Sequence, residues 1–355
     1  MAEPLKLPRQ LPSSTHDVIV VLEEVHLSID ENDIDVGCRS HELISYRRIS
    51  KPDEICRRIQ CASIVIATQA FITNESLGEA PYLKCVITPT ASVNHIDVGE
   101  CHRRGIRVAK CAGSTSPAVA GHALSLYFAA RRKTVLMHNH MRMVDEERNN
   151  SWKRHHSVAV EMQMASGRPP RSIEEEIVGI IGYGHIGKRL EAFCTGLGMK
   201  VLIAERKDST SIQRPAQDMP IRTPFSDVIK QATVLFVSCT TNKETRHMID
   251  AAELCTMQRE AVIVNVSRGD VINTAAVIDA LREQRISGVA VDVFEQEPAS
   301  TAQDSAFLAE DTTDLNITLS PHVGYFSTKT VLTMKAMVQA RIKSFAAGEF
   351  RDFIP

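Results

Sequence analysis

Three ionisable residues follow short apolar runs in the C-terminal half of the sequence. Arg268 follows AVIVNV, Glu297 lies a few residues after GVAVDV, and His322 follows ITLS. Each residue taken alone has an ordinary structural explanation, such as a solvated loop position. If the three runs are neighbouring parallel strands, however, their carboxyl ends meet at one edge of a sheet, where open sheets of this kind bind ligands.

Together these side chains fit the reduction of a 2-oxo acid by hydride transfer. A guanidinium is a rigid fork that binds a carboxylate through two hydrogen bonds, so Arg268 is suited to hold the substrate. Reduction of the carbonyl group places charge on its oxygen, and an imidazole, with an ordinary pKa of ~6.5, is suited to protonate it. We therefore expect His322 to be the acid, with Glu297 favouring the protonated ring and fixing its orientation.

A dinucleotide-binding motif precedes these residues. The sequence GIIGYGHIGKRL contains G-x-G-x-x-G as Gly182, Gly184 and Gly187, between an expected strand and an expected helix. Such glycines permit a tight turn, the approach of a pyrophosphate, and packing of the helix on the sheet, while the helix N-terminus stabilises the anion. The motif predicts a nicotinamide dinucleotide as cofactor, which supplies the hydride.

The residues after the next strand bear on the choice of cofactor. Glu205, eighteen residues past Gly187, can accept both ribose hydroxyls of adenosine and repel a 2′-phosphate. Arg206 and Lys207 follow it directly and could bind that phosphate. The sequence favours NAD and leaves NADP open.

The elements that must position these residues are strands alternating with helices. This alternation implies parallel sheets with helices on both faces. In the second half, six strands at this rhythm match a complete doubly wound dinucleotide-binding sheet. The expected strands are 18–25, 63–68, 85–88 and 106–109, then 177–181, 200–204, 234–238, 261–266, 288–293 and 317–320. Helices are expected at 52–61, at 117–130, and at 328–347, which should return to the first domain, whereas 145–173 should be ordered but irregular.

The composition sets the class of protein. The chain has 355 residues, 43% hydrophobic and 24% charged, with a net charge of −2, which suits a globular protein of two domains and indicates neither a nucleic-acid nor a membrane surface. Nine cysteines without a C-x-x-C pair are expected to be buried free thiols in a reducing compartment. No metal-ligand spacing or membrane-length apolar run occurs in the sequence, and no signal peptide is expected, because the N-terminal residues lack an apolar segment. These features favour a cytoplasmic enzyme or binding protein.

The sequence also resembles the D-2-hydroxyacid dehydrogenase family from about residue 83 to residue 347. The markers, in order, are LKCVIT…NHIDV, PAVAGHALSL, GIIGYGHIGKRLEAF, NVSRGDVINTAAVIDAL, GVAVDVFEQEP and LSPHVGY. The resemblance implies two doubly wound parallel-sheet α/β domains. They are a flavodoxin-like substrate domain, residues 1–123 and 325–355, and an inserted Rossmann NAD-binding domain, residues 124–324. Members of the family usually form homodimers through the NAD-binding domain.

The resemblance implies roles for individual residues as well. It assigns catalysis to Arg268, Glu297 and His322, and places Asp292 against the nicotinamide carboxamide. The implied cofactor contacts are Gly182, Gly184, His185, Ile186, Gly187, Glu205, Arg206, Thr240, Val266, Ser267 and Asp292. The implied substrate contacts are Ser92, Val93, Asn94 and Arg268, and no metal is implied.

The substrate class follows from a weaker similarity. KVLIAERK is similar to the glycerate (hydroxypyruvate) dehydrogenase branch, which makes hydroxypyruvate or glyoxylate the expected substrate. Two positions depart from the family pattern. Ser92 stands where the second glycine of a substrate-binding Gly-x-Gly turn is expected, and only glycine takes φ > 0 freely. Gly121 stands where the family normally has Glu.

These departures keep an alternative open. Transcriptional corepressors related to this family show that its fold can serve an NAD(H)-sensing regulatory protein with little activity. The two functions differ in whether a 2-oxo acid is turned over or NADH instead changes oligomer or partner affinity. A dehydrogenase for another acid, such as formate or phosphite, is less favoured because the extra substrate-binding residues of such enzymes have no counterpart in the sequence.

Overall fold

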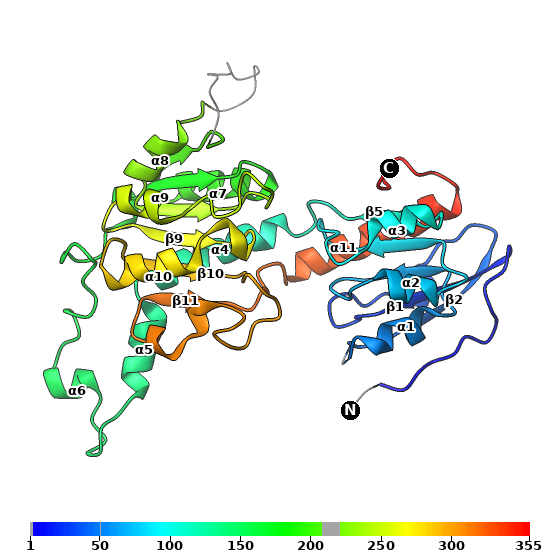
Figure 1. Ribbon diagram of the computed structural model, residues 1–355, viewed down its shortest axis with the longest axis horizontal. Coiled ribbons are helices and arrows are strands. Elements are labelled where there is room, and N and C mark those ends of the chain that lie inside the picture. The colour runs from blue at the N-terminus through cyan, green and yellow to red at the C-terminus, as the bar shows by residue number, and fades with distance from the viewer. Residues whose placement is uncertain (1–2, 50, 208–220) are drawn as a thin grey trace. The chain divides into compact units, whose positions relative to one another are not determined.

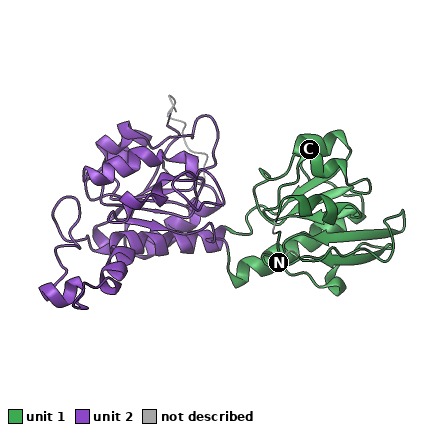
Figure 2. Cartoon of the chain, turned by 60° about the horizontal axis from the view of Figure 1, so that its bottom comes forward, with its two compact units in different colours: residues 1–115, 326–355 green, residues 116–325 purple. Residues whose placement is uncertain are grey.

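The computed structural model describes residues 3–49, 51–207 and 221–355 (Figure 1). The chain forms two compact units, unit 1 from residues 1–115 and 326–355, and unit 2 from residues 116–325 (Figure 2). The chain thus passes between the units at 115/116 and 325/326. The boundaries predicted from the sequence are 123/124 and 324/325. The expected helix 117–130 consequently lies within unit 2.

Unit 1 is a parallel sheet of five strands in the order β2-β1-β3-β4-β5. This is the flavodoxin-like order of a doubly wound sheet. The strands are β1 (His16–Val21), β2 (Ser40–Ser45), β3 (Ile64–Ile66), β4 (Cys85–Thr88) and β5 (Arg107–Lys110). Strand β2 is not among the predicted strands, because Ser40, His41 and Glu42 are polar and the strand lacks an apolar run.

The strands of unit 1 alternate their side chains between two cores. Val18 and Val20 pack in one core, on the face covered by α1 (Asp53–Ile59), α2 (Asn74–Gly78) and α3 (Val98–Arg103). Ile19 and Val21 pack in the other, beneath α11 (Thr328–Ala346). Helix α11 therefore returns to the first unit, as expected.

Unit 2 is a parallel sheet in the order β11-β10-β9-β8-β6-β7. An isolated parallel bridge between Ala204 and Thr223 lies beyond β7, at the place of the third strand in the 3-2-1-4-5-6 order. The chain reverses direction across the sheet between β6 and β8, which is the switch point where such folds bind ligands. The strands are β6 (Ile177–Ile181), β7 (Lys200–Ile203), β8 (Val234–Val237), β9 (Val262–Asn265), β10 (Gly288–Val291) and β11 (Ile317–Leu319).

Alternation again builds two layers in unit 2. Ile263 faces a core shared with α8 (Phe225–Gln231), α9 (Ala251–Thr256) and α10 (Thr274–Arg282). Its neighbour Val264 faces the opposite core, shared with α4 (Ser116–Arg131) and α7 (His185–Gly196). The two units together confirm the predicted fold class of two doubly wound α/β domains.

The segment expected to be irregular contains one short helix, α6 (Ser151–His155), and follows α5 (Thr134–Arg142). Trp152 is 55% exposed. The later part is held to unit 2 by Arg171, whose guanidinium pairs with Glu260 at 2.5 Å. Short 3-10 turns complete the chain at Glu31–Asp33, Ile173–Glu175, Gly269–Val271, Ala306–Leu308 and Glu310–Thr312.

The cysteines are free thiols, as predicted, but not all of them are buried. Cys38 and Cys255 are exposed. In the described residues no helix is long and apolar enough to cross a membrane, and no group of His, Cys, Asp and Glu is arranged to hold a metal ion.

Candidate active site

The three ionisable residues lie beyond the carboxyl ends of three adjacent strands of unit 2. Strands β9, β10 and β11 are paired in parallel. Arg268 follows β9, Glu297 lies on the loop after β10, and His322 follows β11. Chain order and parallel pairing therefore bring these loops to one edge of the sheet.

The backbone of Arg268 is held by a buried amide side chain. Asn265, the last residue of β9, is fully buried. Its Nδ2 donates to the carbonyl oxygen of Arg268 at 2.8 Å, and its Oδ1 accepts the backbone N–H of Ser267 at 3.0 Å. Asn265 is not among the residues predicted from the sequence, although a polar residue at the end of an apolar run is a usable signal.

The guanidinium of Arg268 is half-buried and keeps most of its hydrogen-bonding capacity. Within the described residues it makes one hydrogen bond, from Nη1 to the carbonyl oxygen of Ser267 at 2.6 Å. A guanidinium has five N–H donors, so several remain for an anionic ligand. Its positive charge also contributes to lowering the pKa of Glu297, which indicates that the two groups are electrostatically close.

The loops after β9 and β10 approach each other through Gly269. A Cβ on this residue would lie 2.0 Å from the carbonyl carbon of Phe294 and 2.3 Å from the backbone nitrogen of Glu295. Any side chain here would therefore push the loop of Arg268 away from the loop of Glu297. The sequence contains this glycine in SRGD, but its role is visible only in the structure.

His322 and Glu297 form the pair expected from the sequence. Nδ1 of His322 lies 2.6 Å from Oε2 of Glu297, and the two side chains are 37% and 33% exposed. The other carboxylate oxygen, Oε1, accepts the backbone N–H of Phe294 at 2.9 Å. Burial alone raises the pKa of Glu297, but the bond to His322 and the other favourable contacts outweigh burial and hold the pKa below its ordinary value.

Asp292 supports the turn that carries His322. Its side chain is buried, and its Oδ1 and Oδ2 accept the backbone N–H groups of Val323 at 3.1 Å and Gly324 at 2.9 Å. Burial raises the pKa of Asp292, but hydrogen bonds to the carboxylate, that of His122 the largest, bring the pKa below its ordinary value. The contact between Asp292 and a nicotinamide carboxamide, which the family resemblance implies, stays a prediction.

The glycine motif has the geometry of a phosphate-binding turn. Gly182 has a φ of +92°, and a Cβ there would lie 2.5 Å from the backbone nitrogen of Cys239. A Cβ on Gly187 would lie 2.2 Å from the carbonyl oxygen of Gly182, so the helix packs against the turn itself. A Cβ on Gly184 would have no neighbour within 4 Å.

Gly184 is also the N-cap of α7, where no side chain caps the helix. The backbone N–H groups of the first turn, which include those of His185 and Ile186, therefore have no capping side chain. The space beside Gly184 is open. The first turn contains no acid that would repel an anion. These residues fit the pyrophosphate of a dinucleotide.

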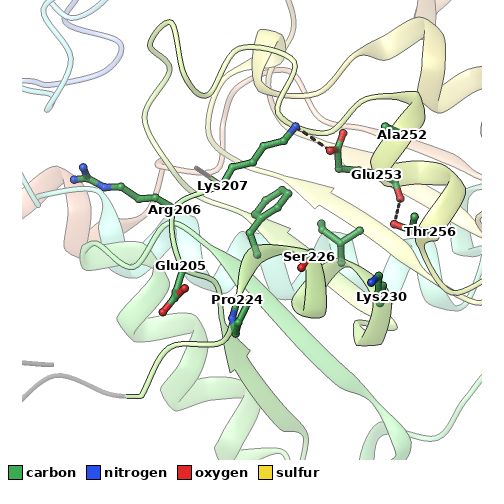
Figure 3. A pocket seen from close by; sticks show the side chains of 11 residues that line it. Glu205, Arg206, Lys207, Pro224, Ser226, Lys230, Ala252, Glu253 and Thr256 are labelled. Carbon is green, nitrogen blue, oxygen red and sulfur yellow. Dashed lines mark hydrogen bonds and ion pairs between the residues drawn. The ribbon is translucent and has the colours of Figure 1, made fainter. Parts of the chain in front are cut away.

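The residues after β7 line a pocket of about 450 Å³ between α8 and α9 (Figure 3). Figure 3 shows Lys207 pointing towards Glu253, with which it pairs at 2.9 Å, while Glu205 and Arg206 point elsewhere. Arg206 is exposed and forms no ion pair with the residues that the structure describes. Of the two basic residues that could bind the 2′-phosphate of NADP, Lys207 is therefore already paired with an acid.

The remaining predicted cofactor contacts lie at the ends of β8 and β9. Thr240 is exposed and its carbonyl oxygen accepts a hydrogen bond from Thr245 Oγ1 at 2.8 Å. Val266 and Ser267 are buried beside Asn265. All three follow strands that flank or lie next to the switch point.

The predicted substrate contacts Ser92, Val93 and Asn94 lie in unit 1, on the loop between β4 and α3. Ser92 is not in the left-handed region; instead its Oγ accepts the backbone N–H of Asn94 at 3.3 Å. The serine thus replaces the glycine turn with a turn closed by its own hydroxyl. The second departure, Gly121, is an exposed helical position where a Cβ would meet nothing within 4 Å.

Comparison with known proteins shows what this chain is similar to. Residues 133–324 match the model of a family described as D-isomer specific 2-hydroxyacid dehydrogenase, NAD binding domain. The chain is 30% identical to a glyoxylate reductase from Thermococcus litoralis over 78% of both chains. It is 26% identical to a glycerate dehydrogenase from Methylorubrum extorquens over 92% of this chain and 97% of the other.

The fold is also shared with solved structures. A D-lactate dehydrogenase from Aquifex aeolicus, complexed with NAD and lactic acid, has a TM-score of 0.70 at 20% identity, covering 95% of this chain and 99% of the other. A D-2-hydroxyisocaproate dehydrogenase gives a TM-score of 0.74 at 18% identity, covering 95% and 99%. At 18–20% sequence identity, these similarities show a shared fold and nothing further.

Proposed function

Because the chain belongs to the D-isomer specific 2-hydroxyacid dehydrogenase family, we propose that it interconverts a small 2-oxo acid and its D-2-hydroxy acid with NAD, and that glyoxylate or hydroxypyruvate is the substrate. Glyoxylate reductases and a glycerate dehydrogenase among its relatives support this substrate class. The observation that carries the proposal is the His322–Glu297 pair, with 2.6 Å between Nδ1 and Oε2, formed by the loops after β10 and β11 next to the loop of Arg268.

Each residue has one task in this proposal. Arg268 binds the substrate carboxylate through its unused donors and so orients the neighbouring carbonyl group. Since Nδ1 of His322 faces Glu297, Nε2 is the nitrogen that gives its proton to the carbonyl oxygen. Glu297 remains a carboxylate, holds the ring, and stabilises its charged form. A bound nicotinamide supplies the hydride that adds to the carbonyl carbon.

The residues around Gly184 would hold the pyrophosphate, and Glu205 would accept the adenosine ribose hydroxyls. The pairing of Lys207 with Glu253 leaves Arg206 as the cation nearest in sequence for a 2′-phosphate. This supports NAD as the preferred cofactor and keeps NADP as the weaker one. Unit 1, with Ser92, Val93 and Asn94, would supply the remaining substrate contacts.

The test is a turnover assay. Purified protein is mixed with NADH or NADPH and a panel of 2-oxo acids that includes glyoxylate and hydroxypyruvate, and loss of the reduced-nicotinamide absorbance is followed. We expect turnover of both acids, faster with NADH. No turnover on the panel, with NADH still bound by fluorescence, would contradict the proposal and favour an NAD(H)-sensing regulatory protein.

Two further expectations accompany the proposal. The protein is expected to form a homodimer through unit 2 and to reside in the cytoplasm. Sedimentation velocity across a concentration series tests the dimer, and fractionation of cells tests the location.

A further inference from the structure

We propose that His122 is a positioning residue for His322, and that it acts through Asp292 and Ser320. The inference rests on the proposed function, because it concerns the turn that presents the catalytic imidazole. His122 lies on α4, about two hundred residues before this turn in the sequence. None of the sequence motifs predicts a role for it.

The turn that carries His322 needs support. His322 has a φ of +52°, a backbone conformation that is unfavourable for a residue other than glycine and persists only when its surroundings impose it. On its C-terminal side the turn is held by Asp292, which accepts the backbone N–H groups of Val323 and Gly324. On its N-terminal side it begins at Ser320, whose carbonyl oxygen accepts the N–H of His322 at 3.1 Å.

His122 contacts both of these supports with one nitrogen. Its Nε2 lies 3.0 Å from Oγ of Ser320 and 3.3 Å from Oδ1 of Asp292. A carboxylate can only accept hydrogen bonds, so the contact requires a proton on Nε2. His122 therefore donates, and it links the two ends of the turn from outside.

The approach of the imidazole depends on a glycine. A Cβ on Gly324 would lie 2.8 Å from Cδ2 of His122 and 2.7 Å from Oδ2 of Asp292. The ring therefore occupies the space that a side chain at residue 324 would fill. Packing and hydrogen bonding together indicate that this contact is specific.

The helix gives His122 a fixed base. Val119, Ala120 and Ala123 of α4 pack in the same core as Val264 of β9 and Ala290 of β10. His122 thus connects the buried helix to the turn. Asp292 is only 3% exposed, and a buried acceptor that loses its donor is destabilising, so removing the imidazole should loosen the turn.

Three variants separate this role from a general loss of stability. His122→Ala removes the donor, and His122→Gln keeps an N–H donor at similar reach. His138→Ala is the matched control, since His138 is exposed on α5. For glyoxylate reduction we expect His122→Ala to lower kcat by roughly 10- to 100-fold, the effect of small misplacement of a catalytic group, with KM and NADH affinity little changed. His122→Gln should recover most of kcat, and His138→Ala should match the wild type.

Hydrogen exchange measured by mass spectrometry on the ligand-free protein reads the turn without catalysis. The amides of Val323 and Gly324 should exchange faster in His122→Ala and regain protection in His122→Gln, while peptides of β9 and β10 stay as in the wild type. Unchanged exchange at these two amides in His122→Ala would overturn the proposal. The proposal would also be overturned if His122→Ala lowered kcat and raised KM together and His122→Gln restored neither. If the wild-type protein reduces no 2-oxo acid, the proposed function fails, and the exchange data still decide whether His122 holds the turn.

Discussion

The Arg268 guanidinium keeps free donors because its backbone is fixed by another residue. Asn265 holds the carbonyl oxygen of Arg268 and the N–H of Ser267, so the position of the arginine does not depend on its own side chain. The planar fork can then bind a carboxylate with two parallel hydrogen bonds. Lysine offers a single ammonium and cannot reproduce that geometry.

Replacing Arg268 with Lys should therefore lower kcat/KM for glyoxylate by about 10²- to 10³-fold, the effect of losing one or two charge-assisted hydrogen bonds at roughly 1.5–3 kcal/mol each. NADH affinity, measured by fluorescence, should stay within about twofold of wild type. Arg282→Lys, at a surface ion pair with Asp311, serves as the control and should change neither value. Equal losses in NADH binding and turnover would show that Arg268 does not act as a substrate clamp.

The lowered pKa of Glu297 determines how the site responds to pH. Because its folded-state pKa lies below the ordinary value, the carboxylate is charged at neutral pH. Its favourable interaction with the imidazole is present above the ordinary carboxyl pKa and is lost only as pH falls through the lowered folded-state pKa. At neutral pH the pair is therefore intact.

Glu297→Gln removes this charge, so the imidazole should give up its proton more easily. The alkaline limb of the kcat/KM profile for 2-oxo acid reduction should move to lower pH, because an opposite charge beside the ring favours its charged form. The measurement is the pH profile between about pH 5 and 10, compared with Glu310→Gln at an exposed site. An unmoved limb would mean that Glu297 does not stabilise the charged ring.

At the scale of elements, the strand-turn-helix unit of β6 and α7 uses its glycines for different purposes. Gly182 and Gly187 are needed for the fold, because a Cβ on either would meet backbone atoms within 2.5 Å. Gly184 leaves space open at an uncapped helix N-terminus. Fold and ligand binding can therefore be separated within one motif.

Gly184→Ala should leave the melting temperature of the ligand-free protein within about 2 °C of wild type, because its methyl group meets no atom within 4 Å, yet weaken NADH binding by more than about tenfold. Gly182→Ala should lower the melting temperature instead, because its clash and positive φ oppose any side chain. Thermal unfolding and NADH titration of both variants test this. Normal NADH binding by Gly184→Ala would exclude the open space as the pyrophosphate site.

At the scale of the whole molecule, the chain builds two units with separate cores. The phosphate-binding turn and the ionisable residues after β9, β10 and β11 all lie in unit 2. Ser92, Val93 and Asn94 lie in unit 1. A ligand that binds the folded form of one unit should therefore stabilise that unit selectively.

Calorimetry of the full chain should show this selectivity. NADH at about 100 times its dissociation constant adds about 2.7 kcal/mol to the unit that binds it, a rise of roughly 5–10 °C for a domain of this size. We expect the transition of unit 2 to rise and that of unit 1 to stay, with no rise in Gly184→Ala. An equal rise of both transitions would show that the units unfold as one.

The sequence alone determined the elements whose signal is local. Apolar runs such as 261–266 and the spacing of Gly182, Gly184 and Gly187 predict strands and a phosphate-binding turn, because burial and glycine backbone geometry depend on adjacent residues. Chain order along parallel strands was enough to bring Arg268, Glu297 and His322 to one edge. Strand β2 was not predicted, because its first three residues are polar. It lies at the edge of its sheet, and an edge strand needs no apolar run.

The contacts between distant segments could not be predicted from the sequence. His122 lies on Ser320 and Asp292, and Gly269 lies against Phe294, through packing of a helix and loops that no spacing in the sequence encodes. Lys207 likewise takes Glu253 as its partner, since side-chain pairing depends on which helix faces the strand end. The residues that could carry out the chemistry can be predicted from the sequence. The residues that hold them in place cannot, because their contacts arise from close packing in three dimensions.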